Sequence, residues 1–296
     1  VIFHFFLFNC ISFGCLFEID RHPKNYKFHI TQALNSLTSY ENTCCLEFST
    51  AFSMGEELIL DTFNELLEPL SIPVVGASAG NLGVELEGTK TLVALNGDMY
   101  KNTCVFIFIH NLNGKIVTYR ENIFIPSGIN FTATDVDCEE RTVYEYDNVP
   151  ALQAMSNALG VDLINIESEL RNHPMGRILG NDLFISEFNK INDDGSIQYY
   201  SRIYNRTKVT ILNMDENIEK IWDETKNYIH NKCEKISFSI VINCYSRTKL
   251  FQQKKLFEKF CDKLNKNYGN FIGMSGYGEQ LNNFHFNQTM VLLCFE

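Results

Sequence analysis

The stretch that decides the fold runs from Ile72 to Asn81 and reads Ile-Pro-Val-Val-Gly-Ala-Ser-Ala-Gly-Asn. Its first four residues are apolar and predict a short buried strand, and the next six, 76–81, are all small. Small residues at the carboxyl end of a strand expose backbone N–H groups and let a ligand approach closely, as a cradle for phosphate or carboxylate requires. A tight turn that packs a crossover against a sheet explains the same residues equally well.

Outward from this stretch towards the N-terminus, residues 44–49 predict a strand and residues 30–40 and 55–70 predict helices. Ser53 is the expected N-cap of the second helix, with Glu56 completing a capping box. The first 17 residues are apolar at most odd positions, so we expect one or two core strands there rather than a membrane anchor. The opening on Val1 in mid-strand suggests a truncated N-terminus.

Towards the C-terminus, strands and helices alternate. Asn-Gly pairs at 96–97 and 113–114 predict hairpins between apolar runs, and Asp193-Asp194-Gly195 predicts another. Further strands are expected at 131–137, 141–147, 207–213, 235–243, 271–279 and 284–295, and helices at 149–160, from 215 and at 250–266. The pattern predicts an α/β fold of mixed sheets with several hairpins and packed amphipathic helices. A composition shift near 126–148 divides it into two closely associated subdomains, 1–146 and 147–296.

Composition narrows the functional classes. The 296 residues carry 25 Lys and Arg against 36 Asp and Glu, a net charge of −11, which argues against a nucleic-acid partner. None of the ten cysteines forms a Cys-x-x-Cys, and the seven histidines are scattered, so no metal or other cofactor is expected. Cysteines within apolar runs indicate a reducing interior, and we expect a cytoplasmic protein with no membrane segment.

Two more motifs follow predicted strands. Asn243, Cys244 and Arg247 lie between a strand and a helix, where the helix N-terminus favours an anion and a guanidinium suits a carboxylate. Gly276-Tyr277-Gly278-Glu279 offers a stacking face and a carboxylate for an ammonium group. The plainer interpretations are a surface Arg paired with an acid and a glycine-rich turn with a solvated acid.

The remaining candidates are polar residues in otherwise apolar surroundings. Asn287 and Thr289 interrupt an apolar strand, so they either line a pocket or satisfy a neighbouring loop. Arg177 is a possible second anion contact in a predicted loop. Cys244 with His285 and Glu279 could instead serve as nucleophile, base and orienting acid, which keeps a Cys-dependent enzyme open as an alternative.

Taken in order, the motifs resemble one family. The chain contains PVVGASAGN from Pro73, an Asn-Gly strand pair, DNVPALQAMSNALG, HPMGRILGNDLFI, INDDGSIQYYSRI, INCYSR, SGYGEQ and FNQT. This series resembles the FIST (F-box and intracellular signal transduction) sensory domain from about residue 45 to the end. Two positions depart from the pattern: Ala77 stands where a second Gly is common, and Asn81 where Asp is common. The FIST N part also looks short.

The resemblance implies a non-enzymatic sensory domain of signal transduction that binds a small molecule, with amino acids as the proposed ligands. Its output would pass to a downstream signalling protein or a fused domain. The implied ligand-binding positions are Gly76, Ser78, Gly80, Asn81, Arg177, Asn243, Cys244, Arg247, Tyr277, Gly278, Glu279, Asn287 and Thr289; no catalytic residue is implied. In this hypothesis Arg247 with the helix N-terminus holds a carboxylate and Glu279 an ammonium group. A ligand-free interaction module remains a further alternative.

Overall fold

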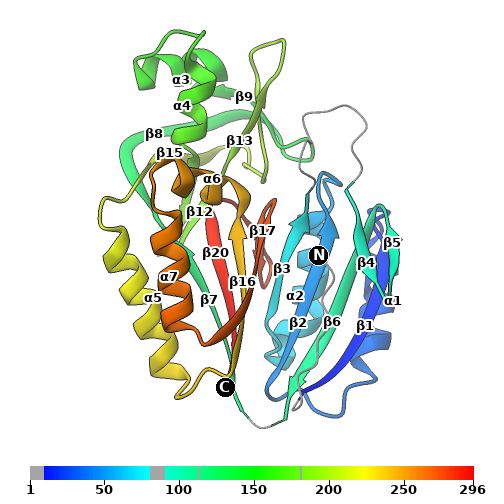
Figure 1. Ribbon diagram of the computed structural model, residues 1–296. Helices are drawn as coiled ribbons and strands as arrows, with labels where there is room; N and C mark the ends of the chain where they lie inside the picture. Colours follow the sequence, from blue (N-terminus) through cyan, green and yellow to red (C-terminus); the bar gives the residue numbers. More distant parts are fainter. Residues whose placement is uncertain (1–9, 81–90, 113, 181) are drawn as a thin grey trace. The chain divides into compact units, whose positions relative to one another are not determined.

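The computed structural model describes residues 10–80, 91–112, 114–180 and 182–296. The chain divides into two compact units (Figure 1). Unit 1 comprises residues 1–121, 219–285 and 289–296, and unit 2 comprises 122–218 and 286–288. Among the sequence-based expectations, those on Asn81, Asn113 and the first nine residues lie outside the described residues. The sequence was predicted to divide into two parts between residues 146 and 147, and that division stays a prediction.

Unit 1 contains two large sheets and one of two strands. The six-stranded sheet has the order β1-β6-β2-β3-β18-β19, and the four-stranded sheet has the order β17-β16-β20-β7. The strands of the first are β1 (Cys10–Glu18), β6 (Thr103–Asn111), β2 (Thr43–Thr50), β3 (Val74–Ala79), β18 (Glu279–Leu281) and β19 (Phe284–Phe286). Those of the second are β17 (Asn270–Gly276), β16 (Phe238–Cys244), β20 (Thr289–Phe295) and β7 (Ile116–Asn122). A small hairpin, β4 (Val93–Leu95) with β5 (Asp98–Tyr100), turns at Asn96 and Gly97, both at positive φ as expected.

The two sheets of unit 1 pack face to face through aliphatic side chains. Leu46, Val75 and Ile109 of the six-stranded sheet share a buried cluster with Ile242 and Val291 of the four-stranded sheet. Because successive residues of a strand point to opposite faces, the other face of each sheet is left for helices. A central strand is therefore buried on both faces, by the other sheet on one and by helices on the other. This explains continuous apolar runs such as CVFIFI in β6.

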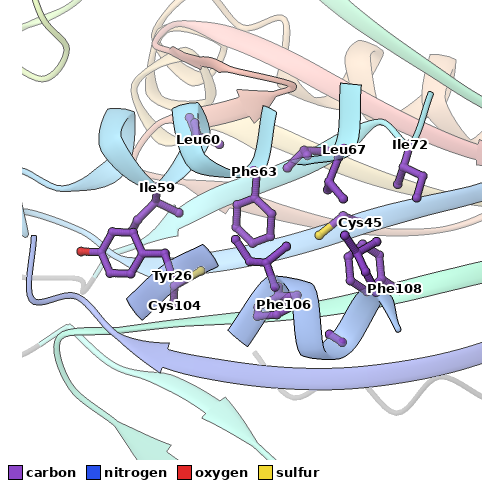
Figure 2. Close-up of a cluster of buried hydrophobic side chains, with 14 of the residues drawn as sticks. Tyr26, Cys45, Ile59, Leu60, Phe63, Leu67, Ile72, Cys104, Phe106 and Phe108 are labelled. Carbon is purple, nitrogen blue, oxygen red and sulfur yellow. The ribbon is translucent and has the colours of Figure 1, made fainter. Parts of the chain in front are cut away.

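Helices α1 (Pro23–Leu34) and α2 (Glu56–Leu67) cover the outer face of the six-stranded sheet. Figure 2 shows Ile59, Phe63 and Leu67 of α2 in a buried cluster with Tyr26 of α1 and strand residues such as Phe106, and their spacing of four is the stripe expected of an amphipathic helix. The rings of Phe63 and Phe106 meet edge to face with centroids 5.2 Å apart. Each such buried Phe contributes about 1.5–3 kcal/mol of transfer free energy, so this cluster anchors α2 to the sheet.

Helices α5 (Ile218–Lys232), α6 (Tyr245–Gln253) and α7 (Phe257–Asn267) accompany the four-stranded sheet (Figure 1). They hold one another through the rings of Trp222, Phe251 and Phe260, whose centroids lie 5.2 to 6.0 Å apart. Unit 1 is thus a four-layer α/β/β/α sandwich. Within the described residues, no helix combines the length and apolarity needed to span a bilayer.

Unit 2 is one antiparallel sheet of eight strands with two helices. Its order is β12-β11-β15-β8-β9-β14-β13, and β10 pairs with β9. The strands are β8 (Phe124–Asp137), β9 (Thr142–Tyr146), β10 (Val149–Pro150), β11 (Met175–Leu179), β12 (Asp182–Ser186), β13 (Phe188–Ile191), β14 (Ile197–Tyr199) and β15 (Thr207–Met214). Helices α3 (Ala151–Leu159) and α4 (Ile166–Asn172) share its buried cluster, and Gly160 ends α3 in the left-handed conformation. The predicted α/β class, mixed sheets and hairpins are confirmed.

Several local predictions were wrong. The helix expected at 30–40 is α1, which ends at Leu34, and the single strand expected at 284–295 is two strands, β19 and β20. The hairpin expected between the apolar runs that flank positions 113 and 114 is not formed, because β6 and β7 belong to different sheets. The helix expected at 250–266 is two helices, α6 and α7, separated near Lys255, whose φ is 57°. The N-cap of α2 is Gly55 rather than Ser53, although Ser53 Oγ accepts a hydrogen bond from the Gly55 N–H.

Candidate functional site

Two motifs that are 200 residues apart in the sequence form one structure in unit 1. Strand β3 pairs with β18 so that Ala77 lies opposite Glu279 and Gly76 opposite Gln280. The Ser78 N–H donates to the Gly278 carbonyl at 3.0 Å, and the Tyr277 N–H donates to the Ser78 carbonyl at 3.0 Å. The small-residue stretch and the Tyr-Gly-Glu segment therefore hold each other by backbone hydrogen bonds.

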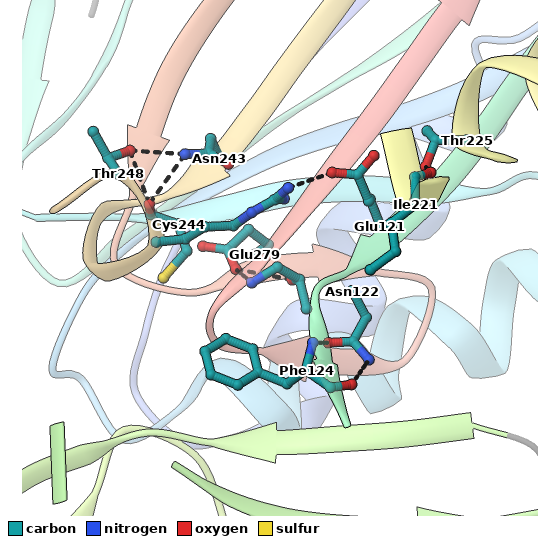
Figure 3. Close-up of polar contacts among 11 residues, drawn as sticks. Glu121, Asn122, Phe124, Ile221, Thr225, Asn243, Cys244, Thr248 and Glu279 are labelled. Carbon is teal, nitrogen blue, oxygen red and sulfur yellow. Dashed lines mark hydrogen bonds and ion pairs between the residues drawn. The ribbon is translucent and has the colours of Figure 1, made fainter. Parts of the chain in front are cut away.

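The motif at the end of β16 reaches the same segment through β17. The two strands are parallel, with Cys244 opposite Gly276. Asn243 Nδ2 donates to Thr248 Oγ1 at 2.8 Å, and the Thr248 hydroxyl is 3.0 Å from the Cys244 carbonyl oxygen (Figure 3). The same hydroxyl is 2.9 Å from Ser275 Oγ. These bonds fix the start of α6 against the end of β17.

Three aromatic rings gather where the strands end. Tyr277 stacks on Tyr245 with ring centroids 5.0 Å apart and meets Phe52 edge to face at 5.8 Å. All three residues are half-buried, and Lys249 Nζ lies 4.7 Å from the centre of the Tyr245 ring. We call Phe52, Tyr245 and Tyr277 the edge cluster. It joins the ends of β2, β16 and β17 into one surface of unit 1.

The backbone around the edge cluster is constrained. Gly80 has no room for a β-carbon because the Tyr277 ring occupies that space. Gly278 has a φ of 124° and faces the His285 ring, so glycine is required there for two reasons. Phe52 and Met54 also have positive φ, at 64° and 54°. Such left-handed non-glycine residues cost free energy and concentrate at functional sites.

The two charged residues expected to hold a ligand have partners inside the fold. Arg247 is fully buried in the first turn of α6 and forms an ion pair with Glu121 of β7. Glu121 is labelled in Figure 3. Glu279 is also buried, and its Oε2 accepts hydrogen bonds from the Thr289 hydroxyl at 2.9 Å and the Thr289 N–H at 3.2 Å. Direct contact of either charge with a ligand would require an exchange of partners, and it stays a prediction.

A buried polar row lies next to the edge cluster. Glu47, Gly76 and Gln280 are neighbours across β2, β3 and β18. Gln280 Nε2 lies 3.4 Å from Ser78 Oγ, and Cys104 donates to Glu47 Oε2 at 3.4 Å. Complete burial raises the pKa of Glu47 to about 8, an effect that the nearby Glu56 carboxylate increases. Glu47 is therefore mainly a neutral acid at neutral pH.

Arg177 and Asn287 belong to unit 2, unlike the other candidate residues that the structure describes. Asn287 is buried, and its Oδ1 accepts a hydrogen bond from the Glu187 N–H at 3.1 Å. Asn287 thus satisfies a neighbouring backbone group, one of the two roles expected for it. Arg177 lies on β11 rather than in a loop.

The enzyme alternative needs an accessible thiolate, and Cys244 is 2% exposed as the N-cap of α6. The proposed orienting acid, Glu279, bonds Thr289 as described above. Within the described residues no group of three or more His, Cys, Asp or Glu side chains is placed to hold a metal ion.

Sequence reasoning did not single out Phe52, Tyr245 or Lys249, nor the buried Glu47 and Glu121. One signal was available for the rings: Phe52, Tyr245 and Tyr277 each come directly after the end of a strand or within two residues of it. The buried acids gave no such signal, because a Glu in a strand is equally typical of a solvated face.

Comparison with protein-family models gives two matches. The FIST N domain model matches residues 7–148, and the FIST C domain model matches residues 151–282. No curated protein matches the sequence. FIST domains are associated with sensory roles in signal transduction and are not known as enzymes. The two models match consecutive segments that together take up most of the chain, in N-to-C order, and the chain therefore belongs to the FIST family.

Proposed function

We propose that the chain is a ligand-binding sensory domain and that its small-molecule ligand binds at the edge cluster of unit 1. The observation that carries this proposal is the contact of Tyr277 with both Tyr245 and Phe52 at the ends of three strands. Ligands of α/β proteins bind beyond the carboxyl ends of strands, and half-buried rings offer them a stacking surface.

The chemistry around the edge cluster suits an α-amino acid. Helix α6 begins at Tyr245, so its N-terminal N–H groups favour a carboxylate, and the Lys249 ammonium adds a positive charge nearby. The faces of Tyr277 and Phe52 attract an ammonium group. The backbone of the site is then supplied or shaped by Asn243, Cys244, Gly76, Ser78, Gly80 and Gly278.

In this proposal Arg247 and Glu279 act mainly through their internal partners. Arg247 holds the start of α6 through Glu121, and Glu279 holds β18 to β20 through Thr289. Both therefore position the rings rather than meet the ligand, which differs from the hypothesis drawn from the sequence.

Signalling would follow from a ligand that binds one conformation better than another and so shifts the population. The partner would be a downstream signalling protein or a fused output domain. We also propose a cytoplasmic setting, because all ten cysteines are free thiols.

A thermal-shift screen with the common amino acids and small carboxylates tests the proposal. A ligand at a hundredfold excess over its Kd stabilises the folded state by about 2.7 kcal/mol, which raises Tm measurably. Tyr277→Ala and Tyr245→Ala should abolish the shift. Tyr228→Ala is the matched control, because Tyr228 also pairs with a tyrosine, Tyr119, and lies under a lysine, Lys232, but on α5.

Two results would contradict the proposal. In the first, no amino acid or carboxylate shifts the Tm of the well-folded protein. In the second, Tyr277→Ala and Tyr228→Ala reduce the shift equally, so that binding does not depend on the edge cluster. The first result favours a ligand-free interaction module.

A further inference from the structure

Arg177 of unit 2 is held by aromatic rings. Its guanidinium carbon lies 4.7 Å from the centre of the Tyr204 ring and 5.5 Å from that of Phe184. Phe184 is directly opposite Arg177 in the β11–β12 pair, and its ring also stacks on that of Phe286 at 5.5 Å with an interplanar angle of 18°. The sheet register and this stack fix the place of the guanidinium.

Ring contacts do not use the hydrogen-bonding capacity of a guanidinium. Its N–H groups lie in its plane, so a guanidinium stacked on a ring can still donate to a carboxylate. Within the described residues Arg177 forms no ion pair, and its Nε is buried without a hydrogen-bond partner. The side chain is half-buried rather than enclosed, so a dissolved anion can approach it.

This arrangement stands out in a chain with an excess of acids. Arg247 of unit 1 is paired with Glu121. Arg171, which belongs to unit 2 like Arg177, is paired with Glu167 at 2.7 Å. Arg171 also lies over a ring, that of Phe188, at 5.1 Å. Arg171 thus has the same aromatic contact as Arg177, and differs in that its charge is already neutralised.

We propose that Arg177, Tyr204 and Phe184 form an anion receptor in unit 2 that binds the carboxylate of a small organic molecule. The guanidinium would receive the carboxylate, and Tyr204, whose side chain is exposed, would face the body of the molecule. This receptor goes beyond the proposed function, because its residues lie in a different unit from the edge cluster and it does not depend on that site.

Benzoate is a suitable probe because it combines a carboxylate with a flat ring, and benzamide is its uncharged counterpart. Titration into the whole chain, followed by ligand-observed NMR, should give saturable benzoate binding and at least tenfold weaker benzamide binding. Arg177→Ala should weaken benzoate binding at least tenfold. Arg177→Lys should weaken it severalfold, since the charge remains but the planar fork is lost. Arg171→Ala should leave it within twofold of the wild type.

Far-UV circular dichroism and Tm verify that each variant folds. If Arg177→Ala does not fold, Arg177→Lys still tests the proposal. The proposal is overturned if the wild type does not bind benzoate, if both Arg177 variants bind it as the wild type does, or if Arg171→Ala weakens it equally. It is also overturned if Tyr277→Ala abolishes benzoate binding, a result that would leave the edge cluster as the site. Unchanged benzoate binding in Tyr277→Ala supports the receptor, whatever the outcome of the amino-acid screen.

Discussion

Arg247 and Glu121 form an ion pair whose side chains are 0% and 1% exposed, in the interior of unit 1. The Arg247 guanidinium also lies over the rings of Phe251 and Phe260, at 5.0 and 5.5 Å. The pair therefore links the start of α6 to β7 and α7. Glu121 is the last residue of unit 1 before the chain enters unit 2.

The first prediction concerns this pair. Arg247→Ala or Glu121→Ala leaves one buried charge without its partner, so we expect each to lower the free energy of unfolding by about 3–5 kcal/mol. The double variant Arg247→Met/Glu121→Leu should recover most of the loss, because neither charge is then buried. Urea denaturation of the four proteins measures these differences.

Arg247→Ala also separates the two roles considered for Arg247. If the variant loses less than about 1 kcal/mol of stability but no longer responds to amino acids, Arg247 is a direct receptor of the ligand and the positioning role is wrong. A large loss of stability in a variant whose remaining folded fraction still binds supports positioning.

Most of the elements were predictable from the sequence, but their pairing was not. Period-two and helical patterns located β2, β6, β16 and α2, because each buries a regular set of side chains. Asn113-Gly114 looked like a hairpin because both flanking runs are apolar. Those runs are apolar for another reason: β6 and β7 lie in separate sheets that are packed face to face.

The second prediction concerns Gly76, in the middle of the buried polar row. A β-carbon there would lie 2.7 Å from both Glu47 Oε1 and Gln280 Oε1 and would clash with the backbone carbonyl of Glu47. Because a backbone atom cannot move aside cheaply, Gly76→Ala should cost about 2–4 kcal/mol of stability. Gly273→Ala in β17 is the control, since its β-carbon would meet only ordinary contacts, the nearest at 3.5 Å. Equal Tm values for the two variants would contradict the prediction.

The third prediction is a pH dependence that comes from Glu47. Its pKa is raised to about 8 in the folded protein by burial, against an unfolded value near the ordinary 4.5. The folded state therefore binds more protons than the unfolded state between these values, so stability falls as pH rises through that window. It is highest below about 4.5 and levels off above about 8, as far as this group is concerned. The slope is about 1.4 kcal/mol per pH unit at most.

Glu47→Gln is the variant that isolates this effect. The groups facing Glu47 are Cys104, Cys45 and Glu56; burial raises the pKa of both thiols well above the window, so they remain neutral there. Glutamine keeps the shape and can donate to the Gln280 oxygen, so we expect wild-type stability at low pH and a smaller loss between pH 5 and 8. Parallel profiles for Glu47→Gln and the wild type would show that another group titrates.

The candidate site was only partly visible in the sequence. Glycines and tyrosine in the Tyr277 segment marked a turn at the end of a strand, and the structure joins it to the small-residue stretch by backbone pairing. The assignment of Arg247 to a ligand rested on its charge and its place before a helix. Position along a chain does not say whether a guanidinium faces solvent or an internal acid, and Glu121 is 126 residues away.

The last prediction concerns Cys244 and decides between a sensor and a Cys-dependent enzyme. A catalytic thiol is accessible and alkylates fast, whereas Cys244 is buried, as are Cys44, Cys45, Cys104, Cys233 and Cys294. Brief treatment of the native protein with iodoacetamide, followed by peptide mass spectrometry, should label the half-buried Cys15, Cys138 and Cys261 before Cys244. The same treatment in denaturant should label all of them and serves as the control. Preferential modification of Cys244 in the native protein would instead identify an activated thiol, which burial alone cannot produce because desolvation disfavours the thiolate.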